Sequence, residues 1–390
     1  MTSGSSKQAA AKKIPLGQPV FGPEEPLAVQ EVFKQAWVLN GPTVRAFEKQ
    51  FAQAVGVPFA AAVSSCTAGM HLALAAYDFP AGSEVLLPAF NFVADGLSVL
   101  QAGLVPVFVD VNPRTANMDV EDLARKVTPK SKAILALHYA GWPCAMDRVM
   151  ELAKKNGLKV VEDASHALGS AYGGKRIGAI GDVTSFSFGP LKMICTGMGG
   201  MVTTADAKLN ARISSDRSYG MDKSMWNRKD SDRPWSYSVQ HLGHNFRMTD
   251  YQAAMGIEQM KKLERFIAIR KQLSEHYDRL LGPMKAFDFF QAEPKAEPVP
   301  LYYAAKLKDP ALRDPLAMFL VEQGIGASVH CDPPLHVHPL YEKFGYKEGQ
   351  FPATEKLAKA ILSLPLYPAM TTQDVDRIAE TIDSFLKGKH

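Results

Sequence analysis

The sequence has 390 residues, of which 46% are hydrophobic and 22% are charged, and its formal net charge is +4. This length exceeds the size at which a single core usually stops growing, so we expect a large domain and a smaller one. An apolar run of about 18 residues, which a membrane-spanning helix needs, does not occur. Three of the four surplus positive charges are lysines of the first 13 residues. The rest of the chain is nearly neutral, which argues against a nucleic-acid-binding protein.

The first 13 residues, MTSGSSKQAAAKK, contain no acidic residue and no apolar segment of the kind found in a signal peptide. We predict that residues 1–13 form a disordered tail and that the protein is cytoplasmic. The four cysteines are too few and too scattered for a disulfide framework.

Two helices are predicted between residues 24 and 55, because Pro23 and Pro42 stand near helix starts and apolar residues recur at helical spacing. A short strand then leads into the turn at residues 64–67 and a helix that we expect to begin near Ala68. The N–H groups at a helix N-terminus can bind a phosphate, and the hydroxyls of Ser65 and Thr67 would add to them. A plain N-cap explains the same residues.

Further along the chain, strands alternate with helices. Residues 84–113 read as strand, turn, helix and strand, and strands at 132–138 and 158–161 flank a helix at 146–156. Such alternation predicts an α/β fold with a mainly parallel central sheet flanked by helices.

Two of the predicted strands end in residues that carry chemistry. Asp163 follows the strand at 158–161, and Lys192 follows the strand-like run at 183–188. The carboxyl ends of parallel strands meet at one edge of the sheet, where small ligands bind. A lysine amine can hold pyridoxal phosphate (PLP) as a Schiff base, and a carboxylate can keep its ring nitrogen protonated. A surface lysine and an N-capping aspartate are the alternative.

The chain resembles the PLP-dependent sugar aminotransferases of the DegT/StrS type, which have the fold-type I aminotransferase architecture. The matching stretches run in order along nearly the whole chain: FEKQFAQAVGV (47–57), SSCTAGMHLAL (64–74), EVLLPAFNFVA (84–94), VPVFVDVNPRT (105–115), VVEDASHALGSAYGGKRIGAIGD (160–182), SFSFGPLK (185–192), GHNFRMTDYQAA (243–254) and LSLPLYPAMT (362–371). The resemblance implies a large PLP-binding domain at residues 14–282 and a smaller C-terminal α/β domain at 283–390.

The resemblance also implies roles for individual residues. Lys192 and Asp163 would be catalytic and would hold the cofactor. The other cofactor-binding residues that it implies are Ser65, Cys66, Thr67, Phe92, His166, Ser187 and Asn245. Phe92 would stack on the cofactor ring, His166 would contact its phenolic oxygen and Ser187 its phosphate.

Asn245 would reach the cofactor phosphate of the neighbouring subunit, so the resemblance implies a homodimer with shared active sites. Arg247 and His336 would approach the sugar. The chain departs from the family at Cys66, where glycine is frequent, and at Met198, where glutamate is usual.

Two further segments carry hypotheses. Residues 217–241 are polar and rich in aromatic residues, which is typical of a loop that covers a substrate, and a single long helix is predicted from 250 to 281. Cys331, His336 and His338 suggest zinc, but no second ligand pair stands at metal spacing, so we predict no metal site.

The function implied by the resemblance is transfer of an amino group from Glu or Gln to a keto group of a deoxysugar, most simply a nucleotide-linked one. A cyclitol aminotransferase, a PLP-dependent dehydratase or aromatising synthase of the same family, and a non-catalytic regulator remain as alternatives. Lys192 argues against the dehydratases in which histidine replaces the lysine.

Overall fold

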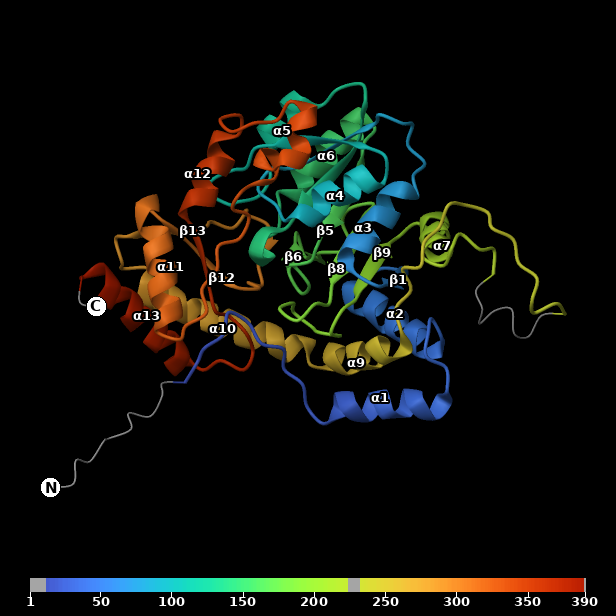
Figure 1. The fold of residues 1–390 in the computed structure, drawn as a ribbon, viewed down its shortest axis with the longest axis horizontal. Coiled ribbons are helices and arrows are strands. Elements are labelled where there is room, and N and C mark those ends of the chain that lie inside the picture. Colours follow the sequence, from blue (N-terminus) through green and yellow to red (C-terminus); the bar gives the residue numbers. More distant parts are fainter. Residues whose placement is uncertain (1–11, 224–231, 389–390) are drawn as a thin grey trace.

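A seven-stranded sheet forms the centre of the molecule in the computed structural model, which describes residues 12–223 and 232–388 (Figure 1). The strands, in their order across the sheet, are β1 (Phe59–Val63), β9 (Gly200–Thr204), β8 (Val183–Ser187), β5 (Lys159–Asp163), β4 (Ser131–Leu137), β2 (Glu84–Pro88) and β3 (Val105–Val109). Only β9 runs antiparallel to its neighbours β1 and β8. The predicted mainly parallel α/β fold is confirmed.

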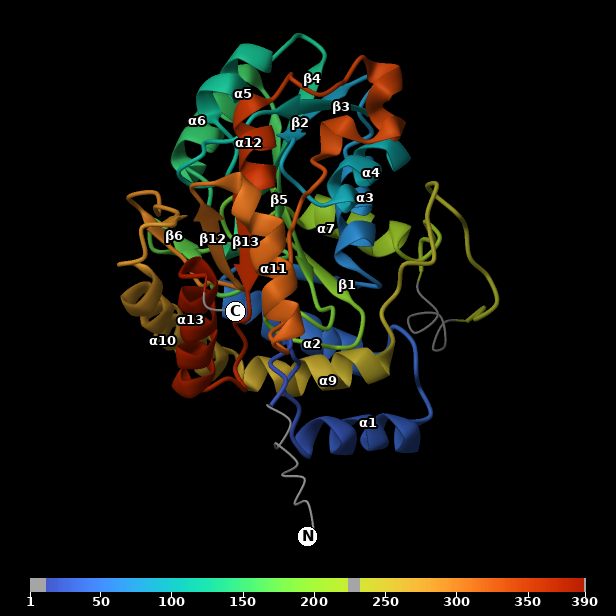
Figure 2. The same cartoon turned by 60° about the vertical axis from the view of Figure 1, so that its left-hand side comes forward.

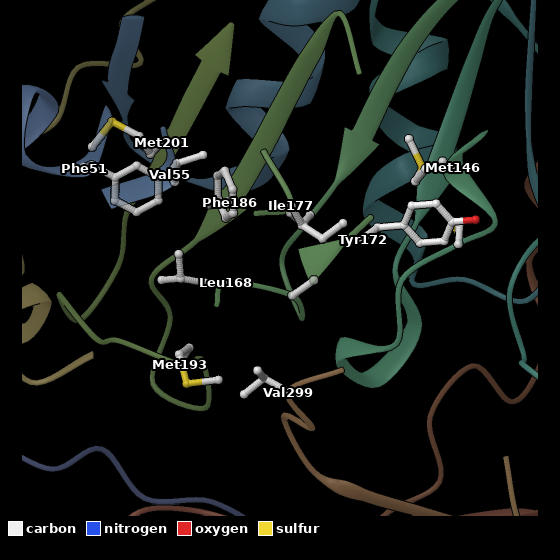
Figure 3. Packing of buried hydrophobic residues seen from close by; sticks show 14 of the residues in the cluster. Phe51, Val55, Met146, Leu168, Tyr172, Ile177, Phe186, Met193, Met201 and Val299 are labelled. Atoms are coloured by element: carbon white, nitrogen blue, oxygen red, sulfur yellow. The ribbon is translucent and has the colours of Figure 1, made fainter. Parts of the chain in front are cut away.

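Both faces of this sheet are covered by helices, because alternate residues of its strands are apolar on both sides. In β4, for example, Ala133 and Leu135 point to one core cluster, and Ile134 and Ala136 point to the other. The first cluster is completed by α3 (Cys66–Ala75), α4 (Val93–Gln101) and α7 (Ala207–Asp216). The second, shown in Figure 3, is completed by α2 (Pro42–Val55), α5 (Val120–Lys126), α6 (Met146–Asn156) and α9 (Asp250–Lys261).

The C-terminal part of the chain has its own sheet and core. Strands β10 (Phe287–Asp288), β12 (Tyr303–Leu307) and β13 (Ile361–Leu364) pair antiparallel. They pack with α10 (Leu263–Leu281), α11 (Arg313–Glu322) and α13 (Thr372–Leu386), which lie together in Figures 1 and 2. This core also includes Ile14 and residues of α10, which precede the predicted domain boundary at 283. The boundary itself stays a prediction.

Short elements connect the two parts. A third sheet joins β11 (Ala296–Glu297), β6 (Ala171–Tyr172) and β7 (Lys175–Arg176), so it links the two parts of the chain. The remaining described elements are α12 (Pro352–Ala360), η1 (Tyr139–Gly141), η2 (Pro310–Leu312), η3 (Leu335–Val337) and η4 (Pro339–Phe344).

The helix predictions hold with two corrections. The two helices between residues 24 and 55 are confirmed as α1 (Glu24–Gln35) and α2, whereas α3 begins at Cys66, two residues before the predicted start. The single helix predicted at 250–281 is wrong, because α9 and α10 are separated at Lys262 (φ −94°, ψ −7°). The ammonium group of Lys262 pairs with Glu24 and Glu25 of α1, at 3.1 and 2.6 Å, which ties the break to that helix.

The predicted tail and loop fall partly outside the described residues. Residues 1–11 of the tail lie outside them, whereas Lys12 is held by an ion pair with Asp374 at 2.9 Å. Of the predicted loop, residues 224–231 lie outside, and its flanks are joined by a bridge between Met221 and Val239. Within residues 12–223 and 232–388, no helix combines the length and the apolar character needed to cross a membrane.

Candidate active site

A cavity of about 370 Å³ lies at the carboxyl ends of β5 and β8, against the N-terminus of α3. Its lining brings together seven of the residues that the sequence singled out, from four separate stretches of the chain: Cys66, Thr67, Phe92, Asp163, His166, Ser187 and Lys192. The structure therefore places a lysine and a carboxylate at one site, as expected from strand ends that share an edge of the sheet.

Lys192 follows β8 and lines the cavity. No carboxylate among residues 12–223 and 232–388 lies within ion-pair distance of its amine. Burial lowers its pKa, and the nearby side chains of Asp163, Cys66 and Asp95 offset part of that shift. A lysine of this kind keeps a larger neutral fraction, which is what a nucleophile or a base requires.

Asp163 is the last residue of β5 and is buried. Its Oδ1 accepts hydrogen bonds from the N–H of Ser165 at 2.7 Å and from the thiol of Cys66 at 3.7 Å. Both bonds hold the carboxylate in a fixed orientation at the cavity. A second carboxyl, that of Asp95, is buried nearby, where burial and the charge of Asp163 raise its pKa well above the usual range.

The N-terminus of α3 has the features of both a capped helix end and a phosphate-binding site. Ser65 is the N-cap, since its hydroxyl accepts from the N–H of Ala68 at 3.1 Å, and it does not line the cavity. Among the described residues, the N–H groups of Cys66 and Thr67 have no acceptor. Gly200 allows close approach here, because a Cβ at that position would lie 2.7 Å from the nitrogen of Cys66. The free N–H groups, together with the hydroxyls of Thr67 and Ser187, fit a phosphate.

His166 and Phe92 complete the predicted set. The Nδ1 atom of His166 accepts from the N–H of Ala140 at 3.3 Å, which assigns the ring hydrogen to Nε2 as a donor. Burial, and then the charge of Lys192, lower the pKa of His166, so the ring is neutral. The ring of Phe92 is 66% exposed although it lines the cavity, which fits an aromatic ring that a planar ligand would cover.

These residues fit PLP as a group. The lysine can hold its aldehyde carbon, Asp163 its ring nitrogen, His166 its phenolic oxygen and the N-terminus of α3 its phosphate. Within the described parts of the chain, no three His, Cys, Asp or Glu side chains are arranged to hold a metal ion.

Besides Ser65, three predicted residues do not line this cavity. Asn245 is exposed and accepts from Nε of Arg247 at 3.0 Å, and neither residue lines the cavity of this chain. The expectation that His336 approaches the sugar needs correction. Its ring is fully buried under Phe351, and its Nε2 pairs with Glu355 at 2.9 Å, so packing holds it away from the cavity.

The structure adds residues that the sequence analysis missed. They come from both ends of the chain and from α10: Leu16, Gly17, Gln18, Arg270, Leu301, Tyr302, His330 and Leu366. Cys331, which the sequence suggested only as a zinc ligand, lines the cavity as well. The rings of His330 and Tyr302 stack at a centroid distance of 4.4 Å. One signal was available in the sequence, because Arg270 stands among the apolar residues of an amphipathic helix. The N-terminal residues offered none.

Comparisons with known proteins agree with this site. The model of the DegT/DnrJ/EryC1/StrS aminotransferase family matches residues 20–383. The spore coat polysaccharide biosynthesis protein SpsC of Bacillus subtilis is 37% identical over 380 residues, which are 96% of this chain and 97% of SpsC. The dTDP-4-dehydro-2,3,6-trideoxy-D-glucose 4-aminotransferase of Saccharopolyspora spinosa is 34% identical over 94% of this chain and 95% of its own. The crystal structure of the aminotransferase TlmJ from Streptoalloteichus hindustanus superimposes with a TM-score of 0.88, at 31% identity, over 96% of this chain and 99% of TlmJ.

Proposed function

The chain belongs to the DegT/DnrJ/EryC1/StrS aminotransferase family, whose members are PLP-dependent aminotransferases, and from this premise we propose its reaction. We propose that it transfers the amino group of Glu or Gln to the keto group of a deoxysugar that is linked to a nucleotide. The observation that carries the proposal is the unpaired amine of the half-buried Lys192 in one cavity with Asp163 and the N-terminus of α3. The relative from Saccharopolyspora spinosa is named after a dTDP-linked keto sugar, and this supports the choice of substrate class.

PLP, when bound, supplies the electron sink that stabilises negative charge on the reacting carbon. Lys192 would bind the cofactor covalently and, once displaced by the donor, would move a proton at the substrate carbon. Asp163 would hold a proton on the ring nitrogen. The Nε2–H of His166 would donate to the phenolic oxygen, and Thr67, Ser187 and the N–H groups of α3 would hold the phosphate.

We further propose a homodimer with shared sites. Two apolar side chains at the cavity are open to solvent in the single chain: Phe92 and Leu191, which is 48% exposed. Exposed apolar residues beside a site are typical of an interface. Asn245 and Arg247, which lie outside the cavity of their own chain, would then serve the partner's site.

The half-reaction with the donor tests the transaminase proposal. Glutamate or glutamine alone should convert the absorbance of bound PLP to that of the pyridoxamine form and release the corresponding 2-oxo acid. A panel of nucleotide-linked keto sugars should then restore the PLP spectrum. If neither donor changes the spectrum while the PLP form dehydrates a sugar or a cyclic keto substrate, the dehydratase or synthase alternative replaces our proposal.

Lys192→Ala provides the matched control. This variant should retain PLP without the absorbance of a covalent complex and should be inactive, since it lacks the amine. Borohydride reduction of the wild-type protein, followed by peptide mapping, should label Lys192. A label on another lysine would contradict the assignment.

A further inference from the structure

Arg270 is a buried cation in the lining of the candidate active site. It lies on α10, on the apolar face that also carries Phe266, Ile267 and Leu273, and it is only 3% exposed. A charged residue on the apolar face of a helix is costly, so it requires a partner or a function.

The contacts of Arg270 with the protein leave its charge unbalanced. Its Nη1 donates to the carbonyl oxygens of Leu301 and Leu366, at 2.5 Å each, whereas its Nε is buried without an acceptor. No carboxylate in residues 12–223 and 232–388 lies within ion-pair distance of this guanidinium. Burial lowers the pKa of Arg270 to about 9, which still leaves the group protonated at neutral pH.

Other buried arginines of the chain do have acidic partners. Arg313, which also donates to a backbone carbonyl, that of Ala358, pairs with Asp314 and Asp332 at 2.7 Å each. Arg217 pairs with Glu48 at 2.5 Å. The missing counter-ion is therefore a specific property of Arg270 and not a general feature of buried arginines in this protein.

The other basic groups of the cavity do not compete for an anion. The described residues that line the cavity include one lysine, Lys192, and one arginine, Arg270. Burial, and then the charge of Lys192, lower the pKa of His330 to about 4, and His166 is neutral as well. Because the reaction uses the amine of Lys192, Arg270 is the cation of this chain's lining that stays available to a substrate.

We propose that Arg270 binds the α-carboxylate of the amino donor. This inference rests on the proposed aminotransferase function and adds the residue that selects the donor. Glutamate and glutamine share the α-carboxylate, which is one bond from the carbon that bears the reacting amino group. It must therefore lie in the same small cavity as Lys192. The planar guanidinium suits a carboxylate, and its two carbonyl partners hold it in place before the donor arrives.

The phosphates of the other ligands fit this position less well. The N-terminus of α3 already offers free N–H groups for the cofactor phosphate. In a nucleotide-linked sugar, the ring separates the diphosphate from the keto carbon, which places the diphosphate farther from Lys192 than a donor carboxylate.

Comparison of donors with and without the α-carboxylate tests the proposal. The rate of cofactor conversion would be measured with glutamate and with 4-aminobutyrate, which is glutamate without that carboxylate, in the wild type, Arg270→Met and Arg313→Met. Arg270→Met should lower kcat/KM for glutamate by about 10- to 150-fold, as expected for a hydrogen bond to a charged group. In Arg270→Met, kcat/KM for 4-aminobutyrate should stay unchanged. Arg313→Met should keep the wild-type ratio of kcat/KM for glutamate to kcat/KM for 4-aminobutyrate.

Equilibrium binding gives a second readout that does not depend on turnover. Glutarate should bind the PLP form of the wild type and of Arg313→Met, and its Kd should rise at least about 10-fold in Arg270→Met. UDP serves as the probe for a nucleotide diphosphate, and its affinity should not change. If Arg270→Met does not fold, Arg270→Lys, which keeps the charge but loses the planar fork, should show a smaller loss in the same direction.

If Arg270→Met lowers kcat/KM equally for glutamate and for 4-aminobutyrate, the role of Arg270 is structural and the proposal is overturned. Weaker binding of UDP but not of glutarate would also overturn it. A wild-type protein that reacts with neither glutamate nor glutamine would instead contradict the proposed aminotransferase function. The Kd of glutarate would then still test whether Arg270 binds a carboxylate.

Discussion

Asp95 and Asp163 are two buried carboxyls near one cavity, and they have different hydrogen-bond partners. Asp163 accepts from the N–H of Ser165 and from the thiol of Cys66, whereas Asp95 is held by the amide of Asn91 at 2.6 Å. Burial and the neighbouring Asp163 raise the pKa of Asp95, so Asp95 carries the proton.

The first prediction concerns the stability of the cofactor-free protein. A carboxyl with a raised pKa in the native state holds its proton, whereas in the unfolded chain it ionises near pH 4. Ionisation then favours the unfolded state, so this group lowers stability progressively as the pH rises above about 4. Asp95→Asn removes the titration, and the gain in Tm over wild type should increase from pH 5 to pH 8. A gain that is the same at all pH values would contradict the raised pKa.

The second prediction separates the two carboxyls by activity. Asp163→Asn should fold but lose about three orders of magnitude or more in turnover, since an amide cannot keep the ring nitrogen protonated, and each ~1.4 kcal/mol at the transition state is a factor of ten. Asp95→Asn is the control and should retain most of the activity. Near-normal turnover by Asp163→Asn would refute the role of Asp163.

The proposed catalytic pair, Lys192 and Asp163, could be placed at one site from the sequence because two strands that share an edge of the sheet lead to them. Arg270 and His330 could not be assigned to the site in this way, since the packing of distant segments brings them there. His336 shows the opposite failure. The family resemblance implied that it approaches the sugar, but Phe351 and Glu355 bury it, and no local pattern shows that contact.

At the scale of elements, the close packing of α9 against α2 depends on one glycine. A Cβ at Gly256 would lie 2.5 to 2.8 Å from three ring carbons of Phe47, a buried residue of the second core cluster. That distance is far below van der Waals contact, so an added methyl group would separate the two helices.

The third prediction follows from this contact. Gly256→Ala should lower the free energy of unfolding by about 1–3 kcal/mol through overpacking, which outweighs the gain in helix propensity. Thermal or urea unfolding would measure the change, with Lys261→Ala, an exposed position of the same helix, as a control within about 0.5 kcal/mol. A Gly256→Ala variant as stable as wild type would show that Phe47 can move aside.

The sequence predicted most elements because their apolar spacing and flanking residues act locally. The break between α9 and α10 was missed for a physical reason, since Lys262 is held there by acids of α1, which is more than 230 residues away in the chain. Helix α3 begins at Cys66 and not near Ala68 as predicted, because the hydroxyl of Ser65 caps the helix by accepting from the N–H of Ala68.

At the scale of the whole molecule, the fourth prediction concerns the proposed homodimer. Lys192→Ala and Asn245→Ala should each be inactive or nearly so as pure proteins. In a mixed dimer, however, one site would combine the intact Lys192 with the intact Asn245. Mixing the two variants under conditions of subunit exchange should therefore restore activity, towards one working site per mixed dimer.

Sedimentation at micromolar concentration checks the oligomeric state independently. A monomer with full cofactor occupancy would count against the proposal, and so would a mixture of exchanged subunits that stays inactive.

The cavity is lined by residues 16–18 and also by Leu366, and Ile14 pairs with Ile325 in the C-terminal part. During translation, the first of these segments leaves the ribosome long before its partners exist. N-terminal regions of nascent chains generally fold first. Residues 14–18, however, can reach their final packing only after Ile325 and Leu366 have been synthesised. Completion of the cavity wall is therefore a late event in biogenesis, and a prematurely terminated chain would lack the wall that Leu301, Tyr302, His330 and Leu366 provide.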